Sequence, residues 1–308
     1  MTRMTRPATV DDLIDSRLMA RLDQLDVVSR KIFSSKIQGE RKSRRRGQSV
    51  EFADFRNYAP GDDLRFVDWN IYARLDRLFL KMFLEEEDLS MVIAIDTSAS
   101  MDTGEPNKFD YARRLAMALG YVGLVNNHRV SLVGFGSNET GPAMARLSGL
   151  RGRRRTREMG SWLLARTCAG EAHFAEAMKA IALGGLGRGV LVIVSDFLHA
   201  DGFERGLRSL SGRGFDLFAM QLLSPQETDP ARGGLSGDMR LVDCESAAEI
   251  EVTASSAILA QYRAAMGGHI ESLRDFCVRR AITHTLVETT QDLDALLLDY
   301  LRRRGLLA

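Results

Sequence analysis

Several features that mark particular classes of protein are scarce in this chain of 308 residues. It has three cysteines, Cys168, Cys244 and Cys277, with no CxxC pair, which excludes a disulfide scaffold. Lys and Arg, 42 in all, nearly balance 41 Asp and Glu, so the net charge of +1 does not favour a protein that coats nucleic acid by bulk charge. Because 45% of the residues are hydrophobic, disorder throughout the chain is not expected either.

Long apolar runs are also missing. The longest, MVIAI at 91–95 and VLVIV at 190–194, fall far short of the roughly 18 residues that a membrane-spanning helix needs. Residues 1–18 include basic side chains but lack the apolar segment of a secretory signal. Free cysteines without a signal indicate a cytoplasmic location.

The chain divides into a charged N-terminal part and a regular C-terminal part. For residues 1–88 we predict a helix to about residue 40, a basic segment at 41–46, a turn-rich stretch with a strand near 77–83, and an acidic run at 85–88. This segment is too short and too charged to stand alone, and we expect it to pack on the main domain. Residues 89–308 alternate between apolar strands and amphipathic helices, ending in a helix at 293–304. The alternation predicts an α/β domain with a doubly wound, mainly parallel sheet.

One group of polar residues stands where the strands of this sheet end. Asp96, Ser98 and Ser100 follow the strand at 91–95, and Asp196 follows the strand at 190–195. Because parallel strands end at one edge of a sheet, these oxygens are expected to face one point, and such hard ligands suit Mg²⁺. The alternative is that the two serines cap the next helix and that Asp96 is only a turn residue.

The order strand, DTSASM and helix, with VSDF later in the chain, resembles the von Willebrand factor A-type domain. The resemblance implies a Rossmann-like fold and a metal-ion-dependent adhesion site (MIDAS), in which D-x-S-x-S is completed by a distal threonine and a distal aspartate. The implied metal ligands are Asp96, Ser98, Ser100 and Asp196. Where the family carries G-G-T-[DN], however, this chain has GEAH, and Ala172 stands at the threonine position. We therefore expect a weakened or conditional magnesium site, in which water replaces the missing hydroxyl.

A second block of sequence resembles the bacterial family called domain of unknown function 58. Its pattern is S-x-R-R-G-x-[SG]-x-E-F, then R-x-Y-x-x-G-D-D-x-R-x-I-D-W, then A-R. This chain matches the pattern at Ser43, Arg45, Gly47, Glu51, Phe52, Arg56, Tyr58, Gly61, Asp62, Asp63, Arg65, Asp68, Trp69, Ala73 and Arg74. The likeness extends from about residue 35 to the carboxyl end. It implies a protein that works beside a MoxR-type AAA+ ATPase in chaperone-like assembly or maturation of other proteins.

The charged residues of this block permit two interpretations. Asp62, Asp63 and Asp68 alternate with arginines at 56, 65 and 74, which predicts an ion-pair network that packs the N-terminal part against the α/β domain. The same residues could instead form a docking surface specific to the family. The arginine cluster at 151–157, like the one at 41–46, is expected to be a solvated loop, with the acidic run at 85–88 as an intrachain partner.

Three classes of function remain open from the sequence. We favour a non-enzymatic, metal-dependent interaction module without catalytic residues, because the cation would keep an open position for a partner's carboxylate and no poised base is evident. The alternatives are a hydrolase or phosphoryl-transfer enzyme using Asp96 or His173, and a nucleic-acid accessory factor using the arginine clusters. No nucleotide-binding G-x-x-x-x-G-K-[ST] and no zinc-ligand spacing of histidines occurs.

Overall fold

The computed structural model describes residues 6–29, 51–84, 89–138, 141–187, 189–233 and 237–307. The chain forms two units, with residues 1–35 and 89–308 in unit 1 and residues 36–88 in unit 2. This division differs from the predicted one, because the first helices belong with the α/β domain. The predicted packing of the N-terminal segment on that domain concerns the relation between the units and stays a prediction.

Unit 1 is built on a six-stranded sheet in the order β10-β7-β6-β3-β4-β5. All neighbours are parallel except β4 and β5, which are antiparallel. The strands are β3 Ser90–Asp96, β4 Arg129–Asn138, β5 Gly141–Leu150, β6 Gly189–Ser195, β7 Phe215–Leu223 and β10 Thr283–Glu288. This confirms the predicted α/β class with its mainly parallel sheet. The antiparallel edge strand β5 was not predicted.

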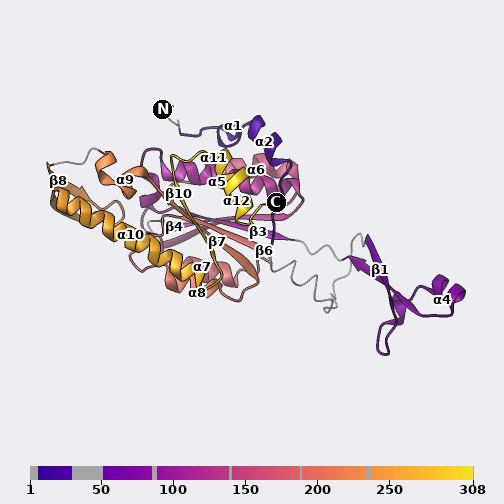
Figure 1. Cartoon of the computed structure of the whole chain (residues 1–308). Coiled ribbons are helices and arrows are strands. Elements are labelled where there is room, and N and C mark those ends of the chain that lie inside the picture. Colours follow the sequence, from indigo (N-terminus) through magenta and orange to yellow (C-terminus); the bar gives the residue numbers. More distant parts are fainter. Residues whose placement is uncertain are drawn as a thin grey trace. The chain divides into compact units, whose positions relative to one another are not determined.

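Helices cover both faces of this sheet (Figure 1). One face is covered by α1 Val10–Leu13, α2 Ser16–Leu22, α5 Lys108–Val125, α6 Thr156–Leu164, α11 Leu293–Ala295 and α12 Leu301–Arg303. The other face holds α7 Phe174–Leu183, α8 Glu204–Leu210 and α10 Ser256–Val278. Short turns complete the unit: η2 Ala99–Asp102, η3 Arg153–Arg155, α9 Pro225–Thr228 and η4 Pro230–Gly233.

The central strands explain why the sheet must be covered twice. On β3, Ile93 packs into the core under α5, while Val92 and Ala94 pack into the core under α7 and α8. All seven residues of β3 are buried, as are all seven of β6. A strand without a polar face cannot border water, and fully burying each large aliphatic side chain stabilises the fold by about 1.5–3 kcal/mol.

Both ends of unit 1 depart from the predicted helices. The expected N-terminal helix is interrupted, since Asp15 caps a new helix by accepting a hydrogen bond from the Leu18 amide, at 2.6 Å. Residues 30–40 of that predicted helix lie outside the described residues. The expected C-terminal helix is divided by a π-helical turn, η5 Leu296–Tyr300. Among the described residues, no helix combines the length and apolar content needed to cross a membrane.

Unit 2 is a small antiparallel ribbon. Strands β1 Glu51–Asn57 and β2 Phe79–Leu84 pair, and between them lie η1 Leu64–Phe66 and α4 Trp69–Leu75. The strand expected near 77–83 is thereby confirmed as β2. The connection from β1 turns at Pro60 and Gly61, where the Asp62 amide donates to the Ala59 carbonyl at 3.0 Å. Gly61 has φ +103°, so the tight turn requires a residue without a Cβ.

A second ribbon follows β7. Strands β8 Gly237–Val242 and β9 Glu249–Ala254 form an antiparallel hairpin between α9 and α10. Nearly all of its residues are exposed. Because it follows the carboxyl end of β7, the hairpin leaves the sheet at the edge where the parallel strands end.

Candidate metal centre

The predicted metal ligands converge at the carboxyl edge of the sheet. Asp96 ends β3 and Asp196 follows β6, and these two strands are parallel neighbours paired in register from Ser90 to Ile95. Asp96 and Ser98 are 0% exposed and Asp196 is 1% exposed, whereas Ser100 is half-buried. The site is therefore embedded in the fold and opens on the Ser100 side.

Hydrogen bonds hold the D-x-S-x-S turn in one shape. Asp96 Oδ1 accepts from the Ser98 amide at 2.9 Å and from Ser98 Oγ at 2.7 Å. The hydroxyls of Ser98 and Ser100 are 3.0 Å apart. Although Ser98 occupies the N-cap of η2, its side chain makes no capping bond, and Asn107 caps α5 instead. The interpretation of these serines as helix caps is therefore not supported.

The spacing of the two hydroxyls fits an octahedral ion. Mg²⁺ binds oxygen at about 2.0–2.1 Å, so two adjacent ligands lie about 3.0 Å apart. The distance between Ser98 Oγ and Ser100 Oγ is 3.0 Å. Asp96, Asp196 and His199 each offer one ligand atom within 4.8 Å of the other two. The donors present are thus of the kind that Mg²⁺ prefers, and their spacing is compatible with a divalent cation.

A buried lysine, which the sequence reasoning missed, faces the same site. Lys108 is the first residue of α5 and is fully buried. Its ammonium group donates to Asp196 Oδ2 at 2.8 Å and also to the carboxylate of Glu227 in α9. Burial disfavours the ionised form of Asp196, but the ammonium outweighs it and holds the pKa of that carboxyl below its usual value. Lys108 therefore keeps Asp196 ionised.

The pKa of Asp96 is shifted in the opposite direction to that of Asp196. Burial raises the pKa of Asp96, and the negative charge of Asp196 raises it further, against the opposing effect of His199. No lysine or arginine ion pair of Asp96 occurs in the described part of the chain. A divalent cation would supply the positive charge that this carboxylate lacks.

His199 is a second site residue that sequence reasoning missed. Its Nε2 atom lies 3.2 Å from Ser195 Oγ and 3.5 Å from Asp96 Oδ2. The ring stacks on Phe174, with centroids 4.8 Å apart and planes at 18°. The only local signal was its position three residues after Asp196. His173, which the enzyme alternative invoked, instead stands at the N-cap of α7.

The loop that carries Ala172 is bonded to the D-x-S-x-S turn. The Ala99 amide donates to the Gly170 carbonyl, and the Ala169 amide donates to the Thr97 carbonyl, each at 2.9 Å. Ala172 itself packs against the core under α7 and α8. The loop thus adjoins the site, as the predicted alignment requires, but position 172 offers no oxygen ligand.

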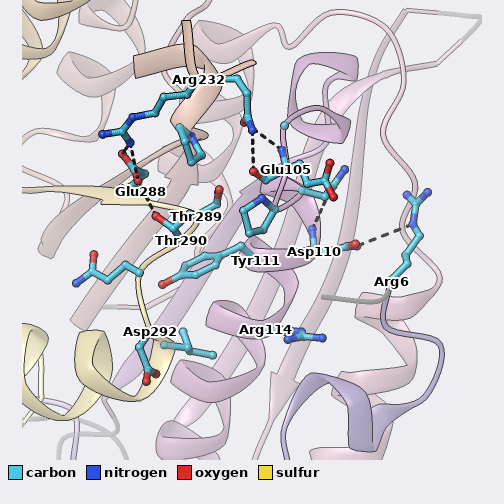
Figure 2. Close-up of a pocket in the computed structure, with 17 residues that line it drawn as sticks. Arg6, Glu105, Asp110, Tyr111, Arg114, Arg232, Glu288, Thr289, Thr290 and Asp292 are labelled. Atoms are coloured by element: carbon cyan, nitrogen blue, oxygen red, sulfur yellow. Dashed lines mark hydrogen bonds and ion pairs between the residues drawn. The ribbon is translucent and has the colours of Figure 1, made fainter. Parts of the chain in front are cut away.

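A cavity of about 1180 Å³ lies at the first turns of α5 (Figure 2). It is lined by the first turns of α5 and by residues that follow β7 and β10. Arg232 and Glu288 form an ion pair at 3.4 Å, and Gln226 donates to the Glu105 carbonyl at 2.9 Å. The Tyr111 hydroxyl is buried and has no hydrogen-bond partner among the described residues. The predicted ligands do not line this cavity.

Unit 2 contains most of the family block, and its charged residues act locally. Arg56 pairs with Asp62, and Arg65 pairs with Asp63, each at 2.6 Å. Asp68, a predicted member of the ion-pair network, caps α4 by accepting from the amides of Asn70 and Ile71. Among the other residues of the block, the Tyr58 amide donates to the Leu78 carbonyl, and Gly61 forms the turn. The rings of Trp69 and Tyr72 meet edge to face, with their centroids 6.1 Å apart. Arg74 forms no ion pair with the described residues.

Some predicted residues cannot be placed. Arg45, Gly47, the basic segment at 41–46 and the acidic run at 85–88 lie outside the described residues, and Glu51 is described only as the first residue of β1. In the cluster at 151–157, Arg153 pairs with Asp23 at 2.9 Å and Arg155 with Glu158 at 2.6 Å. These two arginines therefore have intrachain partners other than the predicted acidic run.

One protein family and several individual proteins are similar to this chain in sequence. The model of a family described as "Protein of unknown function DUF58" matches residues 54–272, more than half of the chain. Uncharacterized proteins of Mycobacterium tuberculosis and Mycobacterium bovis are 27% identical over 281 residues, which cover 87% of this chain and 86% of theirs.

Two solved structures give more distant matches. A von Willebrand factor type A protein from Catenulispora acidiphila is 13% identical, with 74% of this chain and 43% of that chain covered and a TM-score of 0.41. An aerotolerance-related membrane protein from Bacteroides fragilis is 14% identical, with 70% of this chain and 99% of that chain covered and a TM-score of 0.38.

Proposed function

Because this chain belongs to the DUF58 family, we propose that its von Willebrand factor A-like unit is a non-enzymatic protein-interaction module whose binding depends on a divalent cation. The observation that supports this most is the 3.0 Å spacing of the Ser98 and Ser100 hydroxyls beside two buried aspartates. When bound there, Mg²⁺ would supply an electrophilic centre with an open coordination position. A carboxylate of a partner protein is the ligand that such a position accepts.

The residues of this chain act on the binding step in distinct ways. Ser98 and Ser100 would hold the cation directly, while Asp96 fixes the Ser98 hydroxyl toward it. Lys108 holds Asp196 in its ionised form at the same edge. Because Ser100 is half-buried while the acids are enclosed, a partner would approach from the Ser100 side.

The neighbouring serine and histidine do not form a serine triad. In a serine triad, one ring nitrogen of the histidine faces the serine and the other faces the carboxylate. Here the same atom, His199 Nε2, is the one near both Ser195 and Asp96. Ser195 is 0% exposed and donates its proton directly to Asp96 Oδ2 at 2.7 Å. The trio therefore supports the packing of the site rather than an attack on a substrate.

The proposal extends to a partner and a location. The family resemblance suggests a MoxR-type AAA+ ATPase, with which this chain would assist the assembly or maturation of client proteins in the cytoplasm. The three cysteines are free thiols, which suits a reducing compartment.

The proposal is tested by Asp96→Asn, which preserves the shape of the side chain but removes its charge. We expect Mg²⁺ to raise the melting temperature of the wild type in a saturable manner and to leave the variant unchanged. Binding to a purified MoxR-type ATPase, measured by biolayer interferometry without nucleotide, should be lost in EDTA and in the variant. Asp201→Asn, at an exposed turn, is the matched control. If Mg²⁺ raised the melting temperatures of the wild type and of Asp96→Asn equally, the metal site would be contradicted. If the wild type hydrolysed phosphoesters and Asp96→Asn did not, the enzyme alternative would be favoured instead.

A further inference from the structure

Strand β10 leaves one edge of the central sheet open. Among the described residues it pairs with β7 alone. The Thr289 amide, just after the strand, donates to the Leu223 carbonyl of β7 at 3.0 Å. Alternate residues of a parallel strand bond to the same neighbour, so the amides and carbonyls of His284 and Leu286, at odd spacings from Thr289, point to the open side. These backbone groups have no strand partner in the part of the chain that the structure describes.

A cavity of about 690 Å³ follows this open edge. Its lining includes Leu286 of β10, Arg274 and Val278 of α10, and Arg303 and Arg304 at the end of α12. Helix α10 packs on one face of the sheet and α12 on the other. Elements from opposite faces can line one cavity together only where the sheet ends. The cavity therefore lies along the edge of β10.

The side chains along this edge are apolar and positively charged. Leu286 is 41% exposed and Val278 is 70% exposed, although both are large aliphatic residues. Three arginines line the cavity against one acidic residue, Glu271, which pairs with Arg274 at 3.5 Å. Arg303 is exposed and forms no ion pair with the described residues. The edge thus combines open backbone groups with uncovered apolar surface and an excess of positive charge.

We propose that this edge is a docking site for an extended, acidic segment of a partner protein, which adds to the sheet as a strand beside β10. The backbone of the segment would pair with the open groups of His284 and Leu286. Successive side chains of a strand point to opposite faces, so apolar ones would cover Leu286 and Val278 while carboxylates meet Arg303 on the other face. The docking site needs no cation and is independent of the proposed function.

Charge complementarity selects this occupant over two others. In a second copy of this chain, β10 would bring the same arginines, and pairing the two edges would set like charges beside each other. A nucleic acid would use the arginines but not the exposed Leu286 and Val278, and no Phe, Tyr or Trp lines the cavity as a stacking platform for bases. An acidic segment with apolar residues complements both kinds of side chain.

A fluorescein-labelled octapeptide of alternating glutamate and valine tests the docking site by fluorescence anisotropy with the full chain. The wild type should bind it saturably and should not bind the same peptide with lysine in place of glutamate. Leu286→Pro removes the outward amide but spares the ladder with β7, so it should weaken binding about tenfold, whereas Leu286→Val keeps the amide and should not. Arg303→Ser should weaken binding about fivefold. Arg302→Ser, at an exposed position outside the cavity, is the matched control.

The docking site is refuted if the wild type does not bind the glutamate–valine peptide, or if Leu286→Pro binds it as tightly as Leu286→Val does. If Leu286→Pro does not fold, equal binding by Arg303→Ser and Arg302→Ser refutes it instead. A labelled single-stranded DNA of about 12 nucleotides that binds more tightly than the peptide would show that the arginines serve a nucleic acid. Asp96→Asn should bind the peptide as the wild type does, so the docking site and the metal centre can fail separately.

Discussion

Unit 1 encloses an ion pair in its interior, whereas the ion pair of Arg65 and Asp63 in unit 2 lies at the surface. The side chains of Lys108 and Asp196 are 0% and 1% exposed, while those of Arg65 and Asp63 are 80% and 34% exposed. The distances are similar, at 2.8 Å and 2.6 Å. Geometry therefore does not distinguish the two pairs, and the surroundings decide what each contributes.

The same contrast holds for apolar side chains. Ile93, on the central strand of unit 1, is completely buried. In unit 2, Trp69 is 57% exposed and Leu75 is 61% exposed. Unit 1 is stabilised by its cores, and unit 2 by its ribbon, its turn and its helix cap. Each unit contains one of the two tryptophans, Trp162 and Trp69, so single-tryptophan variants can report the unfolding of each unit separately.

The largest effect is expected from Lys108→Met. The change leaves two carboxylates, those of Asp196 and Glu227, without their ammonium partner, and breaking a buried ion pair costs about 3–5 kcal/mol. Urea unfolding followed by Trp162 fluorescence should show this loss, and the transition of Trp69 should not move. Lys179→Met, at an exposed position on α7, is the control. If Lys108→Met lowered the free energy of unfolding by less than about 1 kcal/mol, this ion pair would stabilise the fold no more than a surface ion pair does.

A smaller, pH-dependent effect is expected from His284 on β10. Burial lowers the pKa of His284 from 6.5 to about 4, and the charges of Arg274 and Arg304 act in the same direction. The unfolded chain takes up a proton near pH 6.5, and the folded one only near pH 4, so unit 1 should lose stability as the pH falls through this range. His284→Gln should flatten this part of the melting-temperature profile by a few degrees. An unchanged profile would show that His284 titrates alike in both states.

The smallest effect with a measurable size is expected in unit 2. Asp68→Ala removes the cap of α4, which should cost about 1 kcal/mol. The Trp69 transition should shift, and the Trp162 transition should not. Arg65→Ala, which breaks an exposed pair, should shift neither. A larger loss in Arg65→Ala than in Asp68→Ala would mean that unit 2 depends on its surface pairs after all.

The sheet and the D-x-S-x-S turn could be predicted because their signals are local. Buried strands such as 91–95 and 190–194 are continuous apolar runs, and both predicted acids directly follow such strands. The register of β3 and β6 then brings Asp96 and Asp196 to one edge without further information. For the same reason, the ion-pair pattern in unit 2 was largely visible, since Arg56 and Asp62 are six residues apart.

The rest of the site could not be predicted because its members are brought together only by the fold. Lys108 meets Glu227 across 119 residues, and nothing near either residue indicates the pair. His199 is one of five histidines in the sequence, and only the fold brings its Nε2 atom to 3.5 Å from Asp96 Oδ2. The capping role of Asp68 was not predicted, because charge alternation in a sequence does not distinguish a salt bridge from a helix cap.

The position of residues 36–88 between two parts of unit 1 has a consequence for how the protein can change. The Ser29 hydroxyl donates to Asp216 at the start of β7, and the Val28 amide donates to the Leu306 carbonyl. Ser29 is therefore held near the amino-terminal ends of the strands, and Leu89 directly precedes β3. Asp96 lies at the other end of that strand. Ser29 and Leu89 thus lie at the edge of the sheet opposite to the candidate metal centre, so substitutions beside them can be made without touching its ligands.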